Sequence, residues 1–161
     1  MGLFVDEKNT FDVVVNYVFD QNKELHVIKK DEVEIVKKTK EEKEEINNTL
    51  SKGTDIPFNI IVDLKDYEEK DVRTAVFTFR RPTFDDMPVL MSSIGNFGAN
   101  GSFNAGNLLE FGNRKLKILF VKGVAEDDTG KKTIMNESNL GNLSPALGGA
   151  VVLGMNQFIN M

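Results

Sequence analysis

The chain has 161 residues, a formal net charge of -5, one histidine and no cysteine. The length favours a single domain with a sizeable core, and the lack of cysteine excludes a disulfide scaffold, a cysteine-ligated zinc site and a thiol nucleophile. No run of 18 apolar residues predicts a membrane-spanning helix, and we expect no secretion signal at the start of the chain. These features argue against an enzyme and a cofactor, and they favour a soluble intracellular binding or assembly protein.

Charge and glycine are distributed unevenly along the chain. Residues 1–80 carry 13 basic and 18 acidic side chains, whereas residues 81–161 carry seven of each. Eleven of the 13 glycines lie between Gly95 and Gly154. The whole net charge therefore belongs to the first half of the chain, and the composition changes near the segment Arg80–Pro82.

This change of composition predicts two regions within an α+β fold. We expect a charged, β-rich region over residues 1–81, built from antiparallel hairpins or a small sheet with a charged helix or linker. We expect a helical region rich in glycine, asparagine and phenylalanine over residues 82–161. The two regions would form one compact unit or two small subdomains.

The first strands are predicted from short apolar runs. Residues Phe11 to Phe19 are apolar and β-branched, and turn-forming residues follow them. Residues Leu25 to Val36 predict the second strand of a hairpin and then a third strand. His26 alternates with apolar neighbours here, which favours a half-exposed strand position over a metal ligand.

The segment from Glu34 to Leu50 is dominated by lysine and glutamate. It is either a solvated helix with a thin apolar stripe or a mobile linker. Beyond it, residues 56–64 and 73–80 flank an acidic turn and predict a β-hairpin. The alternation of side chains in the second of these strands places Phe77 and Phe79 on the core face.

Helices are predicted after Pro82, which ends the sheet because proline cannot donate to a strand ladder. Thr83 and Asp86 have the spacing of a capping box. Ser144 and Pro145 have the residue types of an N-cap and a first helical position. The expected elements are a short helix over 84–94, a loop over 95–106, a helix over 107–121, a turn over 125–132, a helical turn over 136–142 and a final helix over 145–160.

Motifs for nucleotides, metals and nucleic acids are weak. The glycines after residue 94 match neither a dinucleotide fingerprint nor a P-loop, and helix capping and turn chemistry account for the acidic clusters. Arg80 and Arg81 interleave with aromatic residues, which is the best nucleic-acid pattern in the chain. Two arginines in an acidic chain do not make a basic patch, so we expect them to pair with Asp85, Asp86 or Asp63.

Two segments contain short motifs that follow one another in a definite order. The first is Phe77–Met87, a strand followed by Arg-Arg-Pro-Thr and an acidic helix start. The second is Phe120–Ile159, in which an apolar run precedes a series of short motifs and a last helix. The motifs of the second segment are the acidic turn Glu126–Lys132, the Asn-Glu-x-x-Leu turn Asn136–Leu140 and the Leu-x-Pro-x-Leu step Leu143–Leu147.

The order of these two segments resembles that of bacteriophage tail assembly chaperones. The resemblance implies a non-catalytic protein of phage tail assembly, located in the host cell cytoplasm. Such proteins bind other tail components, especially the tape measure protein, and act as homo-oligomers or in hetero-assemblies, without nucleic acid or membrane partners. The alternative is a structural virion component, such as a tail, baseplate or capsid accessory subunit. The candidate partner-binding residues are Phe84, Met87, Met91, Phe97, Phe103, Met155 and Phe158, and the motif residues are Arg80, Arg81, Pro82, Thr83, Ser144 and Pro145.

Overall fold

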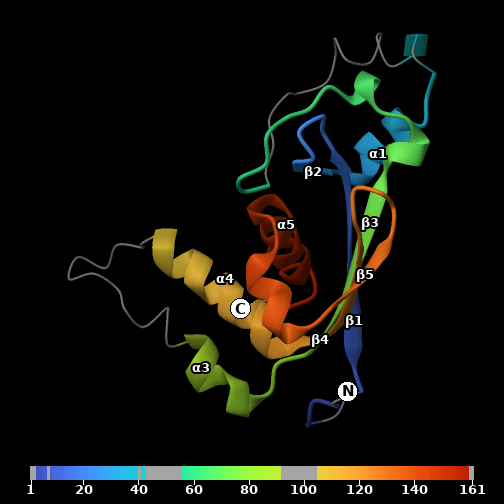
Figure 1. Ribbon diagram of the computed structural model, residues 1–161. Helices are drawn as coiled ribbons and strands as arrows, with labels where there is room; N and C mark the ends of the chain where they lie inside the picture. Colours follow the sequence, from blue (N-terminus) through green and yellow to red (C-terminus); the bar gives the residue numbers. More distant parts are fainter. Residues whose placement is uncertain (1–2, 7, 40, 43–55, 92–104, 160–161) are drawn as a thin grey trace.

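The computed structural model describes residues 3–6, 8–39, 41–42, 56–91 and 105–159 and shows a mixed α+β fold. Five antiparallel strands form one sheet in the order β2-β1-β3-β4-β5. Helices α4 and α5 cover one face of this sheet (Figure 1). The elements just named are β1 (Thr10–Phe19), β2 (Leu25–Ile28), β3 (Arg73–Arg80), β4 (Phe120–Glu126), β5 (Lys132–Met135), α4 (Ala105–Leu119) and α5 (Pro145–Met155).

The core lies between the sheet and α5, and the alternation of the strands produces it. In β1 every second side chain points to the helices, and the inward side chains of β3 stand opposite them. Phe77 and Phe79 are fully buried, as the sequence predicts, and α5 packs against β1 and β2. The inward residues of this layer are Phe11, Val13, Val15 and Tyr17 of β1, Ala75, Phe77 and Phe79 of β3, and Leu147, Val151 and Met155 of α5.

The sheet unites the two halves of the chain, because β3 pairs with β4 along its length. The region after residue 81, which we expect to be helical, also contains two strands, since β4 and β5 form a hairpin within it. Gly123 lets β4 lie close to the core, since a Cβ there would stand 3.0 Å from Phe77 Cδ1. The predicted turn before Lys132 is confirmed, and Asp127 closes it by accepting the backbone N–H groups of Thr129 and Lys131.

The predicted third strand is a helix, α1 (Lys30–Val36). Glu32 accepts the backbone N–H of Lys29 and caps the first turn. Val33 and Val36 are three residues apart, so a helix places both on one face, where they pack into a second small core with Val18 and Leu64.

The predicted hairpin over residues 56–64 and 73–80 is also wrong, because only its second strand forms. Phe58 has a left-handed backbone with φ of 62°, which breaks an extended run. The side-chain amide of Asn59 then replaces a strand, since it accepts from Val27 N and donates to Val27 O at 3.0 and 2.9 Å. The chain continues through two 3-10 turns, η1 (Leu64–Asp66) and η2 (Glu69–Asp71), before β3 begins.

The remaining expectations fall on η3 (Phe84–Asp86), α3 (Met87–Met91), α4, η4 (Glu137–Asn142) and α5. The capping box at Thr83, the helix after it, the helical turn before α5 and the helix start at Pro145 are confirmed. The last helix ends at Met155 rather than Asn160.

The residues 43–55 and 92–104, with most of the Lys/Glu segment and the predicted loop, lie outside the described residues. Within the described ranges, none of the helices has the length and apolar character needed to cross a bilayer.

The small residues of α5 serve the contact with the sheet. A Cβ at Gly154 would overlap Val13 Cγ1 of β1, whereas a Cβ at Gly148 would meet no atom within 4 Å. We expect Gly148→Ala to raise the free energy of unfolding by about 0.5–1 kcal/mol through helix propensity. Gly154→Ala gains the same propensity but overpacks a stiff valine, at a cost of about 1–3 kcal/mol. Urea unfolding of both variants should therefore give shifts of opposite sign, and equal shifts would contradict this packing.

Candidate functional site

The Arg80–Asp86 motif forms a rigid corner at the end of β3. Arg80 donates to both carboxylate oxygens of Asp86 at 2.7 and 2.9 Å, and a third contact joins Arg80 to the carbonyl of Ile118 in α4. Asp86 also accepts the backbone N–H of Thr83 at 2.7 Å. The hydrogen bond from Arg80, together with the bonds from Thr83, holds the pKa of the Asp86 carboxyl well below its usual range. The predicted pairing of Arg80 with an acidic neighbour is thus confirmed.

Arg81 ties the end of the last helix to the same corner. Its guanidinium donates to the carbonyl of Phe158 at 2.9 Å and lies over the ring of Phe11, 5.5 Å from the centroid. The rings of Phe11 and Phe158 stack with their centroids 4.8 Å apart. The predicted pairing of Arg81 with Asp63, Asp85 or Asp86 is therefore wrong among the described residues, because its guanidinium contacts Phe158 and Phe11 instead.

The corner presents three apolar side chains to solvent. Phe84, in η3, is 90% exposed, and Val89 and Met91 of α3 are about half exposed, at 51% and 46%. We call this set, Phe84, Val89 and Met91, the apolar corner. It lies at the lower end of the molecule in Figure 1, where η3 and α3 leave the sheet. Phe84 and Met91, two of the predicted partner-binding residues, are thus accessible and lie on adjoining turns.

The other predicted partner-binding residues have different environments. Met155 is fully buried between α5 and the sheet, so it is a core residue and its assignment to a binding surface is wrong. Met87 is half-buried, and Phe158 is 43% exposed but stacked on Phe11. Phe97 and Phe103 lie outside the described residues. The motif residues Pro82, Ser144 and Pro145 bound the strand β3 and the helix α5, and Ser144 makes no side-chain capping bond.

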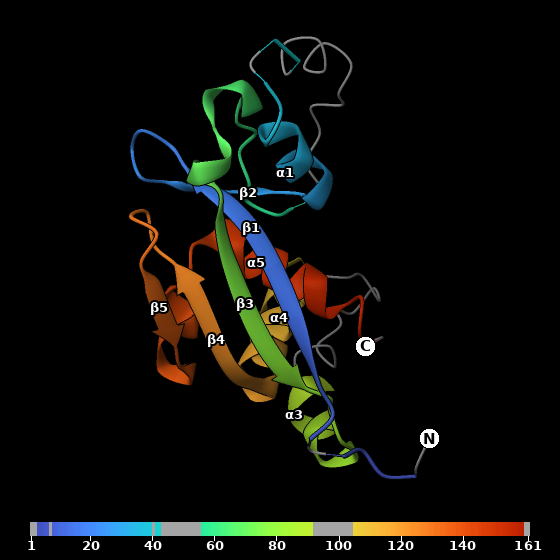
Figure 2. The same cartoon turned by 90° about the vertical axis from the view of Figure 1, so that its right-hand side faces the viewer.

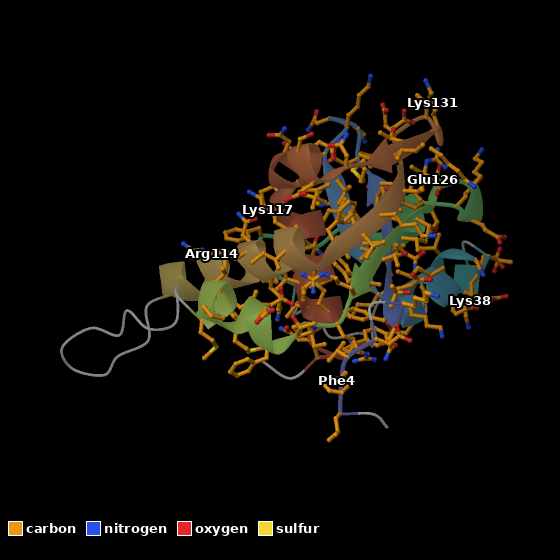
Figure 3. The ribbon with its side chains drawn as sticks, turned by 90° about the horizontal axis from the view of Figure 1, so that it is seen from below. Phe4, Lys38, Arg114, Lys117, Glu126 and Lys131 are labelled. Atoms are coloured by element: carbon orange, nitrogen blue, oxygen red, sulfur yellow. The ribbon has the colours of Figure 1, made fainter. Side chains whose placement is uncertain are left out.

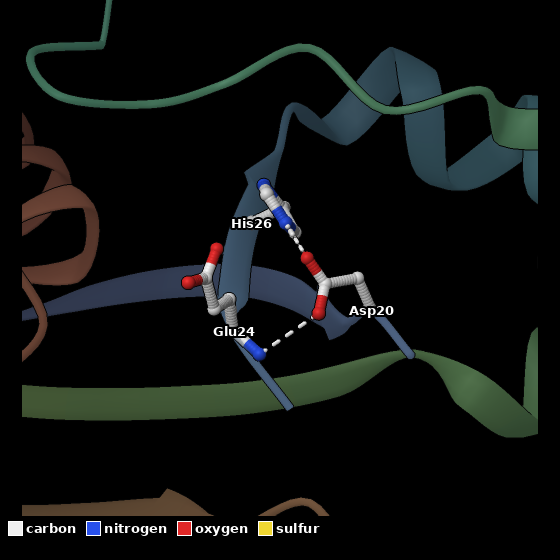
Figure 4. A group of neighbouring side chains, drawn as sticks. All are labelled: Asp20, Glu24 and His26. Carbon is white, nitrogen blue, oxygen red and sulfur yellow. Dashed lines mark hydrogen bonds and ion pairs between the residues drawn. The ribbon is translucent and has the colours of Figure 1, made fainter. Parts of the chain in front are cut away.

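A second group of polar side chains closes the β1–β2 hairpin (Figure 4). Asp20, Glu24 and His26 have ligand atoms within 4.8 Å of one another, and residues of these types can hold a metal ion. Asp20 Oδ1 accepts the backbone N–H of Asn22 and of Glu24, at 2.8 and 3.0 Å, and Asp20 Oδ2 lies 2.7 Å from His26 Nε2. The hydrogen bond to His26, followed by the one from the Glu24 backbone, lowers the pKa of Asp20.

His26 makes a contact through each of its two ring nitrogens. Its Nδ1 lies 3.2 Å from the carbonyl of Ile60, and its Nε2 lies 2.7 Å from Asp20 Oδ2. The ring therefore bridges the hairpin turn and the segment that contains Ile60. The position on β2 agrees with the sequence prediction, but His26 is 4% exposed rather than half-exposed, because the segment around Ile60 covers it. The hydrogen bonds of this group join the two strands and the turn of the β1–β2 hairpin.

A third feature is the face of the sheet that α4 and α5 leave uncovered (Figure 2). The strand register places Val14 opposite Val76, Val76 opposite Val124, and Val124 opposite Ile134. These four side chains, which we call the open-face row, are 57%, 37%, 38% and 77% exposed. They form a continuous apolar line across four strands, on the side of the sheet away from the core.

A buried lysine is the fourth feature. Lys115 of α4 is 1% exposed; its Nζ donates to the side-chain oxygen of Asn156 and lies 5.1 Å from the ring centroid of Phe111. Burial lowers the pKa of this amine. Two residues further along, Lys117 is exposed on the outer side of the helix (Figure 3). Because no solvent reaches Lys115, it is a packing feature and offers no accessible nucleophile.

Comparisons with protein-family models, with curated proteins and with solved structures gave no match. The structure also contains features that the sequence analysis missed: the Asn59 amide on β2, the buried Lys115 and the open-face row. Strand alternation already separates Val14 and Val76 from the core positions. The register that brings four strands into one row comes only from the assembled sheet.

Proposed function

We propose that this chain is a non-catalytic interaction protein of bacteriophage tail assembly that binds another tail protein through the apolar corner. The resemblance to tail assembly chaperones supports the proposal, because one of its two segments, Phe77–Met87, includes this corner. The tape measure protein is the partner that the resemblance implies. Its long apolar helices have the chemistry that an exposed aromatic and aliphatic surface binds.

The proposal rests on the exposure of Phe84 near Asp86, whose carboxylate is held by Arg80 and by the backbone of Thr83. A large aromatic side chain that is 90% exposed keeps its apolar surface in contact with water unless a partner covers it. The neighbouring Arg80–Asp86 pair fixes the backbone on which Phe84 stands. A fixed aromatic residue is typical of a binding hot spot, because little conformational entropy is lost when the partner docks.

The proposal places the protein in the host cell cytoplasm during assembly. Mass spectrometry of purified particles separates it from the alternative, a structural virion subunit. An assembly protein is absent from mature particles, whereas a structural subunit is present at fixed stoichiometry. Finding the chain as a stoichiometric particle component would contradict the assembly role.

The apolar corner is tested by Phe84→Asp in co-expression with tail proteins encoded beside this chain. We expect the wild-type chain to co-purify with a long helical tail protein, and Phe84→Asp to reduce the recovered partner at least about tenfold, since a central aromatic contributes about 2 kcal/mol or more to binding. Ile61→Asp is the matched control, because Ile61 is 53% exposed on a distant segment. Both variants should melt within about 2 °C of the wild type, since they change exposed side chains.

Equal losses for Phe84→Asp and Ile61→Asp would contradict a specific role for the corner. Failure of the wild-type chain to capture any long helical tail protein would contradict the proposed function itself.

A further inference from the structure

The β1–β2 hairpin places the single histidine of the chain beside two carboxylates (Figure 4). One ligand atom from each of Asp20, Glu24 and His26 lies within 4.8 Å of the other two. Glu24 directly precedes β2 and is two residues from His26, so an extended backbone points both side chains to the same side. Asp20 approaches from the other end of the turn, and its Oδ2 lies 2.7 Å from His26 Nε2.

The imidazole ring of His26 is oriented by a group outside this cluster. Its Nδ1 lies 3.2 Å from the carbonyl oxygen of Ile60, and the two hydrogen bonds between the Asn59 amide and Val27 hold this segment against β2. In the neutral tautomer with the proton on Nδ1, Nε2 directs its lone pair at the carboxylates. His26 is 4% exposed, so its surroundings fix the ring. A backbone carbonyl on the second ring nitrogen is the arrangement that orients metal-binding histidines.

The two carboxylates differ in their freedom to move. Asp20 Oδ1 accepts the backbone N–H groups of Asn22 and Glu24 at 2.8 and 3.0 Å, which leaves Oδ2 directed at His26. Glu24 is exposed, and within the described ranges its carboxylate forms no hydrogen bond or ion pair. The cluster therefore offers one held oxygen and one that can turn towards the ring.

The charges around the cluster are mainly acidic. Lys23, the basic residue of the turn, directs its Nζ to Asp128 at 3.8 Å. Asp20 also lines a hollow with three further carboxylates, those of Asp63, Asp66 and Asp71. Lys65 pairs with Asp63 at 3.5 Å but does not line this hollow. The negative potential of these groups favours a cation beside Asp20.

The donor atoms determine which class of ion fits. One imidazole nitrogen with two carboxylate oxygens suits zinc and related transition metals, whereas Mg²⁺ and Ca²⁺ prefer oxygen ligands alone. A tetrahedral zinc ion holds such donors about 3.4 Å apart, so Asp20 Oδ2 and His26 Nε2 have to separate by about 0.7 Å. A hollow of about 470 Å³, which Glu24 and His26 line, gives the ion and a fourth, water ligand access. We propose that Asp20, Glu24 and His26 bind one divalent transition-metal ion of the zinc type, which joins the hairpin turn to β2.

NMR of the imidazole ring tests this site directly, because His26 is the single histidine of the chain. Zn²⁺ added to the full chain should change the ¹⁵N signal of Nε2 and leave Nδ1 protonated, with saturation at one ion per chain. Mg²⁺ at the same concentration should leave both ring signals unchanged, because it lacks the preference for imidazole.

Glu24→Gln removes one ligand without removing a contact of the folded chain. We expect it to weaken Zn²⁺ binding, measured by calorimetry, at least about tenfold. Its melting temperature without metal should stay within about 2 °C of the wild type, since the side chain is exposed. Glu137→Gln is the matched control, because it removes the same charge from an exposed glutamate outside the cluster, and it should bind Zn²⁺ as the wild type does.

The melting temperature gives a further readout. Zn²⁺ at about 100 times its dissociation constant should raise that of the wild type by about 5–10 °C, and raise that of Glu24→Gln less at the same concentration.

Three results would overturn the proposal. One is a His26 ring whose signals stay unchanged at about 1 mM Zn²⁺, the weak limit for a specific site. Another is equal Zn²⁺ affinity in the wild type and Glu24→Gln, or an equal loss in Glu24→Gln and Glu137→Gln. The third is a response of the ring to Mg²⁺ as large as its response to Zn²⁺.

Discussion

Asp86→Asn is expected to lower the free energy of unfolding by about 3 kcal/mol, the lower end of the range for breaking a buried ion pair. The Asp86 side chain is 14% exposed and the Arg80 side chain 29%, so water screens this pair only in part. Asparagine retains one acceptor oxygen but removes the charge and places an N–H₂ group against the guanidinium. Urea unfolding at pH 7 measures the loss.

Asp85→Asn is the matched control, because Asp85 is the neighbouring residue, is exposed and has no hydrogen bond or ion pair among the described residues. We expect it to change the free energy of unfolding by no more than about 0.5 kcal/mol. A loss as large in Asp85→Asn as in Asp86→Asn would show that the net charge of the turn, and not the clamp, stabilises the corner.

The pH dependence of the free energy of unfolding gives a second test of the Arg80–Asp86 pair. The pKa of Asp86 is lowered in the folded state, so the carboxylate contributes stability above its unfolded pKa of about 3.9, and this contribution is lost as the pH falls towards the folded pKa. The difference between the wild type and Asp86→Asn should therefore be constant from about pH 5 to 7 and shrink below about pH 4. A difference that does not shrink in acid would contradict a charge-based role for Asp86.

The segment that contains the Arg80–Asp86 pair also illustrates what the sequence could predict. Arg80, Pro82, Thr83 and Asp86 lie within seven consecutive residues, so local chemistry alone predicts a strand end, a capping box and an ion pair. The strands β1 and β3 were predictable for a similar reason, since their apolar side chains alternate over eight residues or more. The functional reading of the corner as a docking surface stays a prediction.

The errors occur where long-range contacts decide the structure. The segment after Ile56 has strand-like composition, but the positive φ of Phe58 and the bonds between Asn59 and Val27 give it another role. The strand β4 was missed because its apolar run is short and interrupted by Lys122 and Gly123, and its partner β3 lies more than 40 residues away. Tertiary pairing overrides local propensity at such positions.

Methionine exposure shows the same limit. Met91 and Met155 are the last residues of α3 and α5, yet one is 46% exposed and the other fully buried. The difference arises because α5 packs on β1 and β2 of the sheet, whereas α3 packs on α4 and η3. The residue type alone therefore did not predict which of the two methionines would be buried in the core.

Lys115→Met is expected to raise the free energy of unfolding at pH 7 by about 2 kcal/mol, within the range seen when buried ionic groups are replaced by apolar residues of similar volume. Lys115 is 1% exposed, and its amine has the Asn156 side-chain oxygen and the Phe111 ring as neighbours in place of an ion pair. Methionine fills nearly the same volume, and Asn156 is exposed, so water can satisfy its amide after the substitution.

The sign of the pH dependence follows from the lowered pKa of Lys115. Below the folded pKa both states are protonated, and the folded state bears the full cost of burying the charge. As the pH rises from the folded pKa towards the unfolded value of about 10.4, the folded state binds fewer protons than the unfolded state, so the stability of the wild type increases. The advantage of Lys115→Met should therefore be largest at neutral pH and shrink by pH 10.

Lys117→Met separates this effect from a general preference for methionine in α4, because Lys117 is exposed on the same helix (Figure 3). We expect that variant to stay within about 0.5 kcal/mol of the wild type at every pH. A gain for Lys117→Met equal to that for Lys115→Met would attribute the effect to helix propensity. A loss of stability in Lys115→Met alone would show that the bond to Asn156 outweighs the cost of burying the amine, so that Lys115 stabilises the contact between α4 and the end of α5.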